Sequence, residues 1–165
     1  MAVNSFRTLA MATAVVLAAG CAAHAETQPC RILLTNDDGI QHAGIRAAYL
    51  GLSKVCQVVI SAPATNMSGM SHAILNTRGP TKVTEITLEP GVTGYAVEGS
   101  PAEAVAFGIL TLGKDHPFNL VVSGVNEGHN TGILNLYSGT VNAAMEGAVR
   151  GVPSIAVSAS SGIVQ

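Results

Sequence analysis

The sequence predicts an α/β fold in which helices cover both faces of a mainly parallel sheet. Hydrophobic residues make up 48% of the chain and charged residues only 11%, a composition that fits a buried sheet and excludes a disordered chain. Short apolar runs alternate with segments of helical spacing, which is typical of right-handed β–α–β units. With 165 residues, the chain is long enough for one domain with its own core.

Two buried strands with a helix between them are predicted in the first part of this pattern. Apolar runs at 31–35 and 57–61 indicate the strands, and apolar residues at helical spacing indicate a helix over 44–54. Turn-forming residues at 36–39 follow the first strand, and a polar loop at 64–72 follows the second. Both loops are therefore expected at the carboxyl ends of strands.

The middle of the chain predicts additional β structure. Residues 73–77 and 82–88 alternate between apolar and polar side chains, and Arg-Gly-Pro at 78–80 suggests a turn between them. A short strand is expected at 95–97. We interpret the segment from about 73 to 97 as a β excursion inserted into the alternating pattern.

A helix is predicted from residue 100 to about 112. Ser100 can cap it, Pro101 suits its first position, and Glu103 completes a capping box. Next come a buried strand at 119–122 and a long glycine-rich loop that continues to residue 139. The pattern ends with a helix at about 140–150 and a strand at 154–158.

The first 25 residues are typical of a secretory signal peptide. An apolar, Ala-rich run at 8–20 is followed by Ala-His-Ala at 23–25, a small-x-small cleavage site. The run is too short for a stable membrane span. We expect export, to the periplasm, of a mature domain over 26–165; lipid anchoring through Cys21 is the alternative.

Two cysteines remain after the signal peptide, one just before each of the first two strands. If these strands are parallel neighbours, Cys30 and Cys56 lie at the same edge of the sheet. An oxidising compartment would let a disulfide between them persist. The alternative is two unrelated small buried residues.

The adjacent acidic residues Asp37 and Asp38 are the first candidate for chemistry. Ligands of open α/β sheets bind beyond the carboxyl ends of the strands, where the loops at 36–39, 64–72 and 123–139 should converge. Two neighbouring carboxylates repel each other and lose solvation there, and no lysine lies nearby. A divalent cation would compensate them. The alternative is a solvated turn in which Asp38 caps the next helix.

The other two loops contribute neutral oxygen donors. Such donors together with carboxylates favour Mg²⁺, Mn²⁺ or Ca²⁺ over a metal that prefers thiolates, although Asn and Ser in loops are also common turn formers. The donors are Asn66, Ser68 and Ser71 in the second loop and Ser123, Asn126 and Asn130 in the third.

A candidate phosphate site lies just before the last predicted helix. Ser138, Gly139 and Thr140 would place hydroxyls and backbone N–H groups at a helix start, where phosphates bind; an ordinary helix cap is the alternative. The chain lacks the G-x-S-x-G, Walker and G-x-G-x-x-G motifs. With a net charge of −2 and no basic run, it gives no reason to expect binding to nucleic-acid polymers.

Several ordered blocks of sequence resemble the bacterial survival protein E (SurE) nucleotidases. The resemblance covers essentially everything after the signal peptide. It implies a Rossmann-like core and a divalent-metal phosphohydrolase, with Mg²⁺ or Mn²⁺, that acts on nucleoside 5′- and 3′-monophosphates or similar small phosphate esters. The blocks are RILLTNDDGI at 31–40, NMSG at 66–69, GSPA at 99–102, VVSGVN at 121–126, YSGT at 137–140 and GVPSIAVS at 151–158.

The resemblance also implies roles for individual residues. Metal ligands would be Asp37, Asp38, Ser68 and Asn126, with both aspartates counted as catalytic. The metal would polarise a phosphoryl oxygen and activate the attacking water. Contacts to phosphate or substrate are expected from Asn36, Gly39, Asn130, Ser138, Gly139 and Thr140.

Two departures from the family pattern bear on substrate and assembly. Ala64-Thr65 replaces a charged Asp-Arg pair, and Gly-Ile-Leu-Asn stands at 132–135 where the family has Gly-Asp-Asp. Family members usually continue well beyond the strand at 154–158 and form dimers or tetramers, so we expect a chain shortened at its C-terminus. A metal- or nucleotide-binding module without catalysis, or an inactive fragment, is the alternative function.

Overall fold

The computed structural model describes residues 29–77, 79–160 and 162, which form a six-stranded sheet. The strands lie in the order β3-β4-β2-β1-β5-β6, and only β3 runs antiparallel to its neighbour. Their bounds are β1 (Arg31–Thr35), β2 (Gln57–Pro63), β3 (Val83–Glu89), β4 (Val92–Val97), β5 (Leu120–Glu127) and β6 (Ser154–Ala159).

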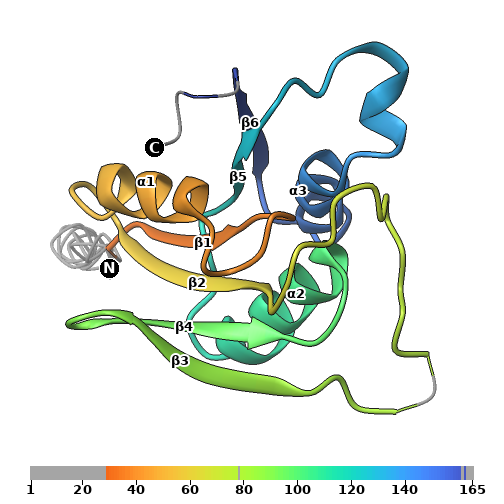
Figure 1. Cartoon of the computed structure of the whole chain (residues 1–165). Coiled ribbons are helices and arrows are strands. Elements are labelled where there is room, and N and C mark those ends of the chain that lie inside the picture. The colour runs from red at the N-terminus through yellow and green to blue at the C-terminus, as the bar shows by residue number, and fades with distance from the viewer. Residues whose placement is uncertain (1–28, 78, 161, 163–165) are drawn as a thin grey trace, which may run out of the picture.

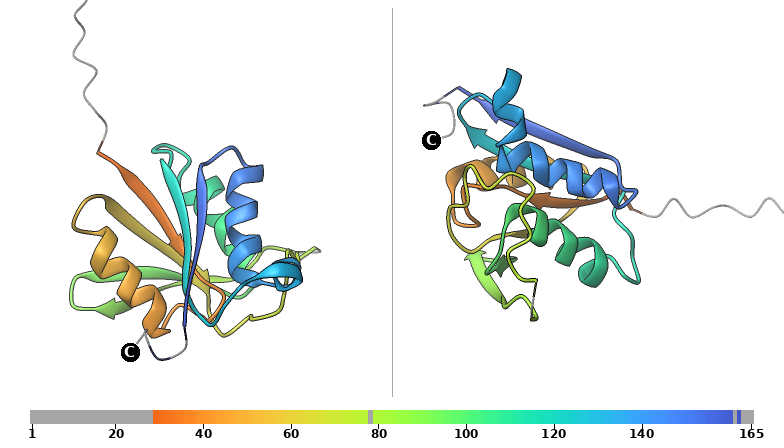
Figure 2. Two further views of the ribbon diagram at one scale, coloured as in Figure 1. Left: turned by 90° about the horizontal axis from the view of Figure 1, so that it is seen from above. Right: turned by 90° about the vertical axis from the view of Figure 1, so that its right-hand side faces the viewer.

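Helices cover both faces of this sheet. Helix α1 lies on one face, whereas α2 and α3 pack against each other on the opposite face (Figures 1 and 2). The predicted three-layer α/β fold is thereby confirmed. The bounds are α1 (Ala43–Leu52), α2 (Pro101–Phe107) and α3 (Gly139–Val149), with a π-helical turn η1 (Gly108–Leu112) after α2 and a 3-10 helix η2 (Gly132–Leu136) before α3.

The core is divided in two by the sheet because neighbouring side chains of β1 point to opposite faces. Ile32 and Leu34 belong to the cluster beneath α1, together with Ile45 of that helix. Leu33 belongs to the other cluster, with Val105 of α2. Leu33 is fully buried, so we expect its replacement by Ala to cost roughly 3 kcal/mol.

Most predicted elements are present, with different ends. The strand predicted at 31–35 is confirmed without change as β1, and the capping box of Ser100 and Glu103 is present at the start of α2. The strand predicted at 119–122 continues as β5 to Glu127, through the Ser-Gly-Val-Asn that the sequence assigned to a loop. Ser123 pairs with both β1 and β6, and Asn126 and Glu127 pair with β6, so the extra residues belong to the sheet.

The predicted β excursion is confirmed for its later strands, as β3 and β4, and is wrong for its first strand at 73–77. Residues 73–77 form no strand; they are held against α2, where Asn76 N donates to Glu103 Oε1 and Ser100 Oγ donates to the carbonyl of Ala73. The turn predicted at 78–80 includes residue 78, which lies outside the described residues. The hairpin is instead β3–β4, and because β4 pairs in parallel with β2, it extends the main sheet.

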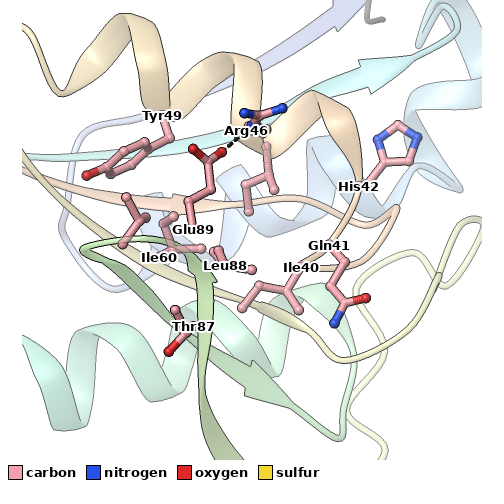
Figure 3. A pocket seen from close by; sticks show the side chains of 11 residues that line it. Ile40, Gln41, His42, Arg46, Tyr49, Ile60, Thr87, Leu88 and Glu89 are labelled. Atoms are coloured by element: carbon pink, nitrogen blue, oxygen red, sulfur yellow. Dashed lines mark hydrogen bonds and ion pairs between the residues drawn. The ribbon is translucent and has the colours of Figure 1, made fainter.

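A cavity of about 250 Å³ lies between α1 and the β3–β4 hairpin (Figure 3). Helix α1 contributes one wall of it, and the end of β3 with the start of β4 contributes the other. Its existence depends on the hairpin being part of the sheet, beside β2.

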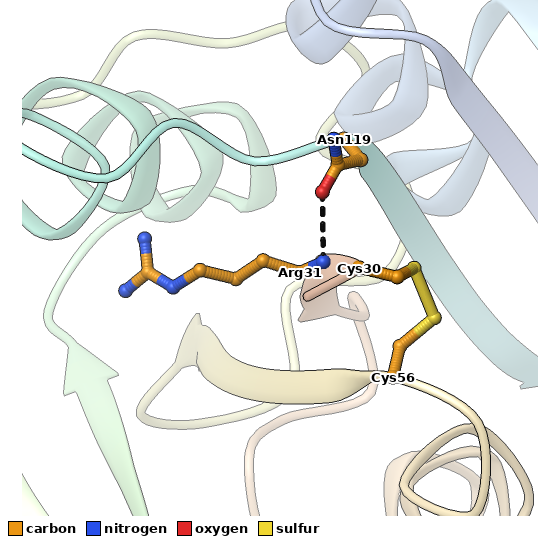
Figure 4. The surroundings of a disulfide bond; sticks show 4 residues. All are labelled: Cys30, Arg31, Cys56 and Asn119. Carbon is orange, nitrogen blue, oxygen red and sulfur yellow. Dashed lines mark hydrogen bonds between the residues drawn. A yellow bond between two sulfur atoms is a disulfide. The ribbon is translucent and has the colours of Figure 1, made fainter. Parts of the chain in front are cut away.

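Of the two alternatives for the cysteines, the disulfide is the one present (Figure 4). Cys30 and Cys56 precede the parallel neighbours β1 and β2, and their Cα atoms are 4.8 Å apart. The bond closes a loop across 26 positions, for which chain entropy predicts a stabilisation of roughly 3 kcal/mol.

The predicted signal peptide over 1–25 lies outside the described residues. Within the part of the chain that the structure describes, no helix combines the length and the apolar character needed to cross a bilayer.

Candidate metal and phosphate site

The turn after β1 is built by Asn36 and Gly39. Asn36 is fully buried, and its Nδ2 donates to the carbonyl of Gly39 at 2.8 Å. Gly39 has a φ of +104°, and a Cβ there would lie 3.1 Å from the backbone of Thr65. The N–H of Ile40 then donates to the carbonyl of Pro63, at the end of β2. The turn therefore requires glycine and joins the ends of β1 and β2.

Asp37 is held on the α3 side of the turn. Its side chain is almost fully buried, and Thr140 Oγ1 donates to Asp37 Oδ1 at 2.6 Å. A Cβ on Gly139 would lie 2.6 Å from the Cβ of Asp37, so the start of α3 approaches this closely only because residue 139 is glycine. The carbonyl of Asp37 accepts from the N–H of Met67, which fixes the loop at 64–72 beside the turn.

Asp38 lies on the other side of the turn, near α1 and β5. Burial, and then the charge of Asp37, raise the pKa of Asp38 above its ordinary value; His42 and the backbone N–H of Glu127 oppose the rise. His42 Nδ1 is 3.7 Å from Asp38 Oδ2 and accepts the N–H of Gly44 as the cap of α1. The surroundings of Asp38 thus leave its charge poorly compensated.

Unpaired buried oxygens lie at the end of β1, in the turn that follows it and on the neighbouring strand β5. Five buried side-chain polar atoms in the described residues lack a hydrogen-bond partner, and four of them are Thr35 Oγ1, Asn36 Oδ1, Asp38 Oδ2 and Ser123 Oγ. Thr35 and Ser123 are paired in register across the two strands. Because buried polar atoms are almost always paired, a group of unpaired oxygens beside two carboxylates fits a cation.

The donor set suits a hard divalent ion. The described residues bring no three His, Cys, Asp or Glu side chains together as a metal-binding group. An ion here would therefore need hydroxyl or amide oxygens in addition to Asp37 and Asp38, as Mg²⁺ and Mn²⁺ accept.

Ser68 and Asn126 lie on the two loops that flank the turn. Ser68 is exposed, and its N–H donates to Asn66 Oδ1, one residue from the contact between Met67 and Asp37. Asn126 is near the end of β5, next to Glu127, and its Nδ2 donates to the carbonyl of Gly128. The fold brings both segments to the turn, and the role of each side chain as a ligand stays a prediction.

Three residues predicted to contact phosphate have hydrogen-bond partners within the chain. Asn130 Nδ2 donates to Ser158 Oγ of β6, and no hydrogen bond joins it to the aspartates among the described residues. Ser138 Oγ accepts the N–H of Val141 and so caps α3, while the hydroxyl of Thr140 is engaged by Asp37. The ordinary cap is therefore present at this helix start, where Gly139 is buried against Asp37. Phosphate binding there stays a prediction.

Sequence reasoning missed three neighbours of the aspartates. Thr35 is the last residue of an apolar run, where a polar side chain is a signal in itself. His42 follows Asp38 by four positions, a spacing that could have indicated contact across the start of α1. Nothing in the sequence indicates Glu127, because its proximity depends on β5 continuing beyond residue 122.

The chain resembles known proteins over most of its described length. The model of the family described as Survival protein SurE matches residues 32–163. A 5′-nucleotidase SurE from Solidesulfovibrio magneticus is 50% identical over 130 residues, which cover 78% of this chain and 50% of that protein. The one from Methanothermobacter thermautotrophicus is 48% identical over 129 residues, or 78% and 48% of the two chains.

A solved structure of a SurE protein also matches the chain. The SurE protein from Aquifex aeolicus matches with a TM-score of 0.68 and 39% identity, over 78% of this chain and 50% of that one. The chain spans about half the length of the curated relatives it matches. The family match covers the turn with both aspartates and the strands that position it, and on this ground the chain belongs to the SurE family.

Proposed function

We propose that the chain carries the catalytic site of a divalent-metal-dependent phosphatase that hydrolyses nucleoside 5′- and 3′-monophosphates. The observation that carries this proposal is the unpaired, buried Oδ2 of Asp38 beside a second carboxylate at a strand end. Relatives named 5′-nucleotidase support the substrate class.

The residues present fit a divalent cation, Mg²⁺ or Mn²⁺. Asp37 and Asp38 would hold it with carboxylate oxygens, Ser68 with a hydroxyl and Asn126 with an amide oxygen. When bound, such an ion supplies a Lewis acid for the phosphoryl group and lowers the pKa of water.

The chain's own residues prepare this chemistry by fixing positions. Thr140 donates to Asp37 Oδ1 and so fixes this carboxylate against the start of α3. Asn36 closes the turn and thereby sets the direction of Asp38. Backbone N–H groups at the start of α3 and the Asn130 amide are our candidates for stabilising negative charge on the phosphate oxygens.

A phosphate-release assay tests the proposal. The chain is incubated with nucleoside 5′- and 3′-monophosphates and with simple phosphate esters, in Mg²⁺ or Mn²⁺ and then in EDTA. We expect phosphate release from the nucleotides that EDTA abolishes and added metal restores. Metal binding without release would instead support the binding module, and release that EDTA does not affect would contradict the proposed chemistry.

We also propose that the chain is exported to the periplasm, with lipid anchoring through Cys21 as the alternative. The disulfide between Cys30 and Cys56 supports an oxidising compartment. Mass spectrometry of the protein from fractionated cells would test this: a periplasmic N-terminus at Glu26 is expected, an acylated Cys21 would support the anchor, and an intact Met1 in the cytoplasm would contradict both.

A further inference from the structure

The cavity between α1 and the β3–β4 hairpin is separate from the metal and phosphate contacts but adjoins them. Its inner surface is apolar and is formed by Ile40, Ile45, Ile60 and Leu88. At about 250 Å³ it is smaller than the pockets that take drug-sized ligands, and it suits a single small ring system.

The outer part of the cavity is polar. Arg46 and Glu89 form an ion pair across it, from α1 to the end of β3 (Figure 3). The amide of Gln41, just before α1, and the ring of Tyr49, on α1, lie toward opposite ends of the cavity. A ligand here would thus meet apolar surface on its faces and both donors and acceptors at its edges.

His42 connects the cavity with the candidate cation site. It lines the cavity, and its Nδ1 is 3.7 Å from Asp38 Oδ2. Along α1, the rise from His42 to Tyr49 is about 10 Å. His42 and Tyr49 lie at opposite ends of the drawn cavity (Figure 3). The cavity therefore begins beside Asp38 and extends away from it over the length of a small ligand.

We propose that this cavity binds the base of a nucleotide whose phosphate lies at the Asp37–Asp38 turn, with Tyr49 as a wall for the ring. The proposal rests on the proposed phosphatase function and deepens it by assigning a place to the nucleoside. A planar base has apolar faces and hydrogen-bonding edges, which match the apolar floor and the polar rim. A purely aliphatic group could form no hydrogen bonds with Arg46, Glu89 or Gln41.

Binding of a nucleoside without phosphate tests the cavity independently of catalysis. Adenosine is titrated into the full chain in EDTA, with ribose as the ligand that lacks a base, and amide chemical shifts are recorded by NMR. We expect adenosine, and not ribose, to shift amides at 40–49 and 87–92. Shifts confined to other parts of the chain, or none with adenosine at millimolar concentration, would overturn the assignment.

Substitutions of Tyr49 test the same assignment in the hydrolysis assay. Stacking of a base on an aromatic side chain is commonly worth about tenfold or more in binding. For Tyr49→Ala we therefore expect the KM for adenosine 5′-monophosphate to rise about tenfold, with an unchanged KM for ribose 5-phosphate. Tyr49→Phe should retain the low KM. Leu50→Ala, which removes a half-exposed apolar side chain from the same helix outside the cavity, is the matched control.

The outcomes separate the two proposals. Equal changes in KM for both esters, or equal effects of Tyr49→Ala and Leu50→Ala, would contradict the base-binding role, while phosphate release would still stand. If neither ester is hydrolysed, the phosphatase proposal fails, and the adenosine titration alone decides the cavity. Thermal unfolding of each variant excludes a general loss of structure as the cause.

Discussion

Two largely buried carboxylates, Glu103 at the start of α2 and Asp38 in the turn after β1, differ in how far the surrounding groups compensate their charge. Burial raises the pKa of Glu103, but the N–H groups of Ser100 and Asn76 among others outweigh it, and the net pKa is lower than the ordinary value. Burial and the charge of Asp37 raise the pKa of Asp38, and the opposing groups do not offset them.

This difference separates a carboxylate that stabilises the fold from one whose charge the fold leaves poorly compensated. Glu103 accepts hydrogen bonds from the chain with both oxygens and completes a capping box. Asp38 leaves Oδ2 buried and without a hydrogen bond from the described residues. Functional sites commonly carry such unfavourable groups at the expense of stability.

Asp38→Asn tests the functional side of this comparison, and its expected effect on activity is the largest. We expect phosphate release to fall by about 100- to 1000-fold, because a charged ligand is lost while the shape is kept. The melting temperature of the metal-free protein should stay the same or rise, since a buried charge beside Asp37 is removed. Exposed Asp115→Asn is the control. Near-normal turnover in Asp38→Asn would contradict the site.

Gly139→Ala should show how closely α3 must approach the aspartates. A Cβ at residue 139 would lie 2.6 Å from the Cβ of Asp37, so the substitution should destabilise the protein by about 2 kcal/mol and lower activity with it. Gly51→Ala in α1 is the matched control, because a Cβ there meets nothing within 4 Å. That variant should be stabilised by about 0.5–1 kcal/mol. Urea unfolding measures both; similar changes would contradict the close approach.

Glu103→Gln should change stability and leave hydrolysis intact. The substitution replaces the charged acceptor of two backbone hydrogen bonds with a neutral one. It should lower the free energy of unfolding by about 1–2 kcal/mol at pH 7. Because the folded-state pKa of Glu103 is below its ordinary value of 4.5, its stabilisation is fully present above that pH and is lost as the pH falls through the folded-state pKa.

Urea unfolding from pH 7 to pH 3 measures this effect. The difference between the wild type and Glu103→Gln should shrink at the acid end, and exposed Glu85→Gln on β3 should differ from the wild type by less than about 0.5 kcal/mol throughout. A difference that grows with acid would contradict the described hydrogen bonds.

The fold could be predicted from the sequence where the signal is local. β1 is an uninterrupted apolar run, and the start of α2 has Ser100, Pro101 and Glu103 at capping positions, so both were located to the residue. The alternation at 73–77 was misleading, because distant groups of α2 satisfy that segment. The membership of β4 in the main sheet depends on its pairing with β2, which no local pattern shows.

The candidate site was predictable only in part, for the same reason. The turn of Asp37 and Asp38 is visible as turn formers after a buried strand, and parallel topology brings the loops of Ser68 and Asn126 toward it. The bond from Thr140 to Asp37 joins residues 103 positions apart. The cavity beside His42 requires the correct place of the hairpin, which the sequence did not indicate.

Metal-dependent stabilisation tests the central claim, that Asp38 is completed by a cation, most directly. Chelator-stripped wild type and Asp38→Asn are melted while Mn²⁺ is titrated. At about 100 times the dissociation constant, the melting temperature of the wild type should rise by roughly 5–10 °C, and that of Asp38→Asn should not change. An equal rise in both proteins, or none in the wild type, would contradict the claim.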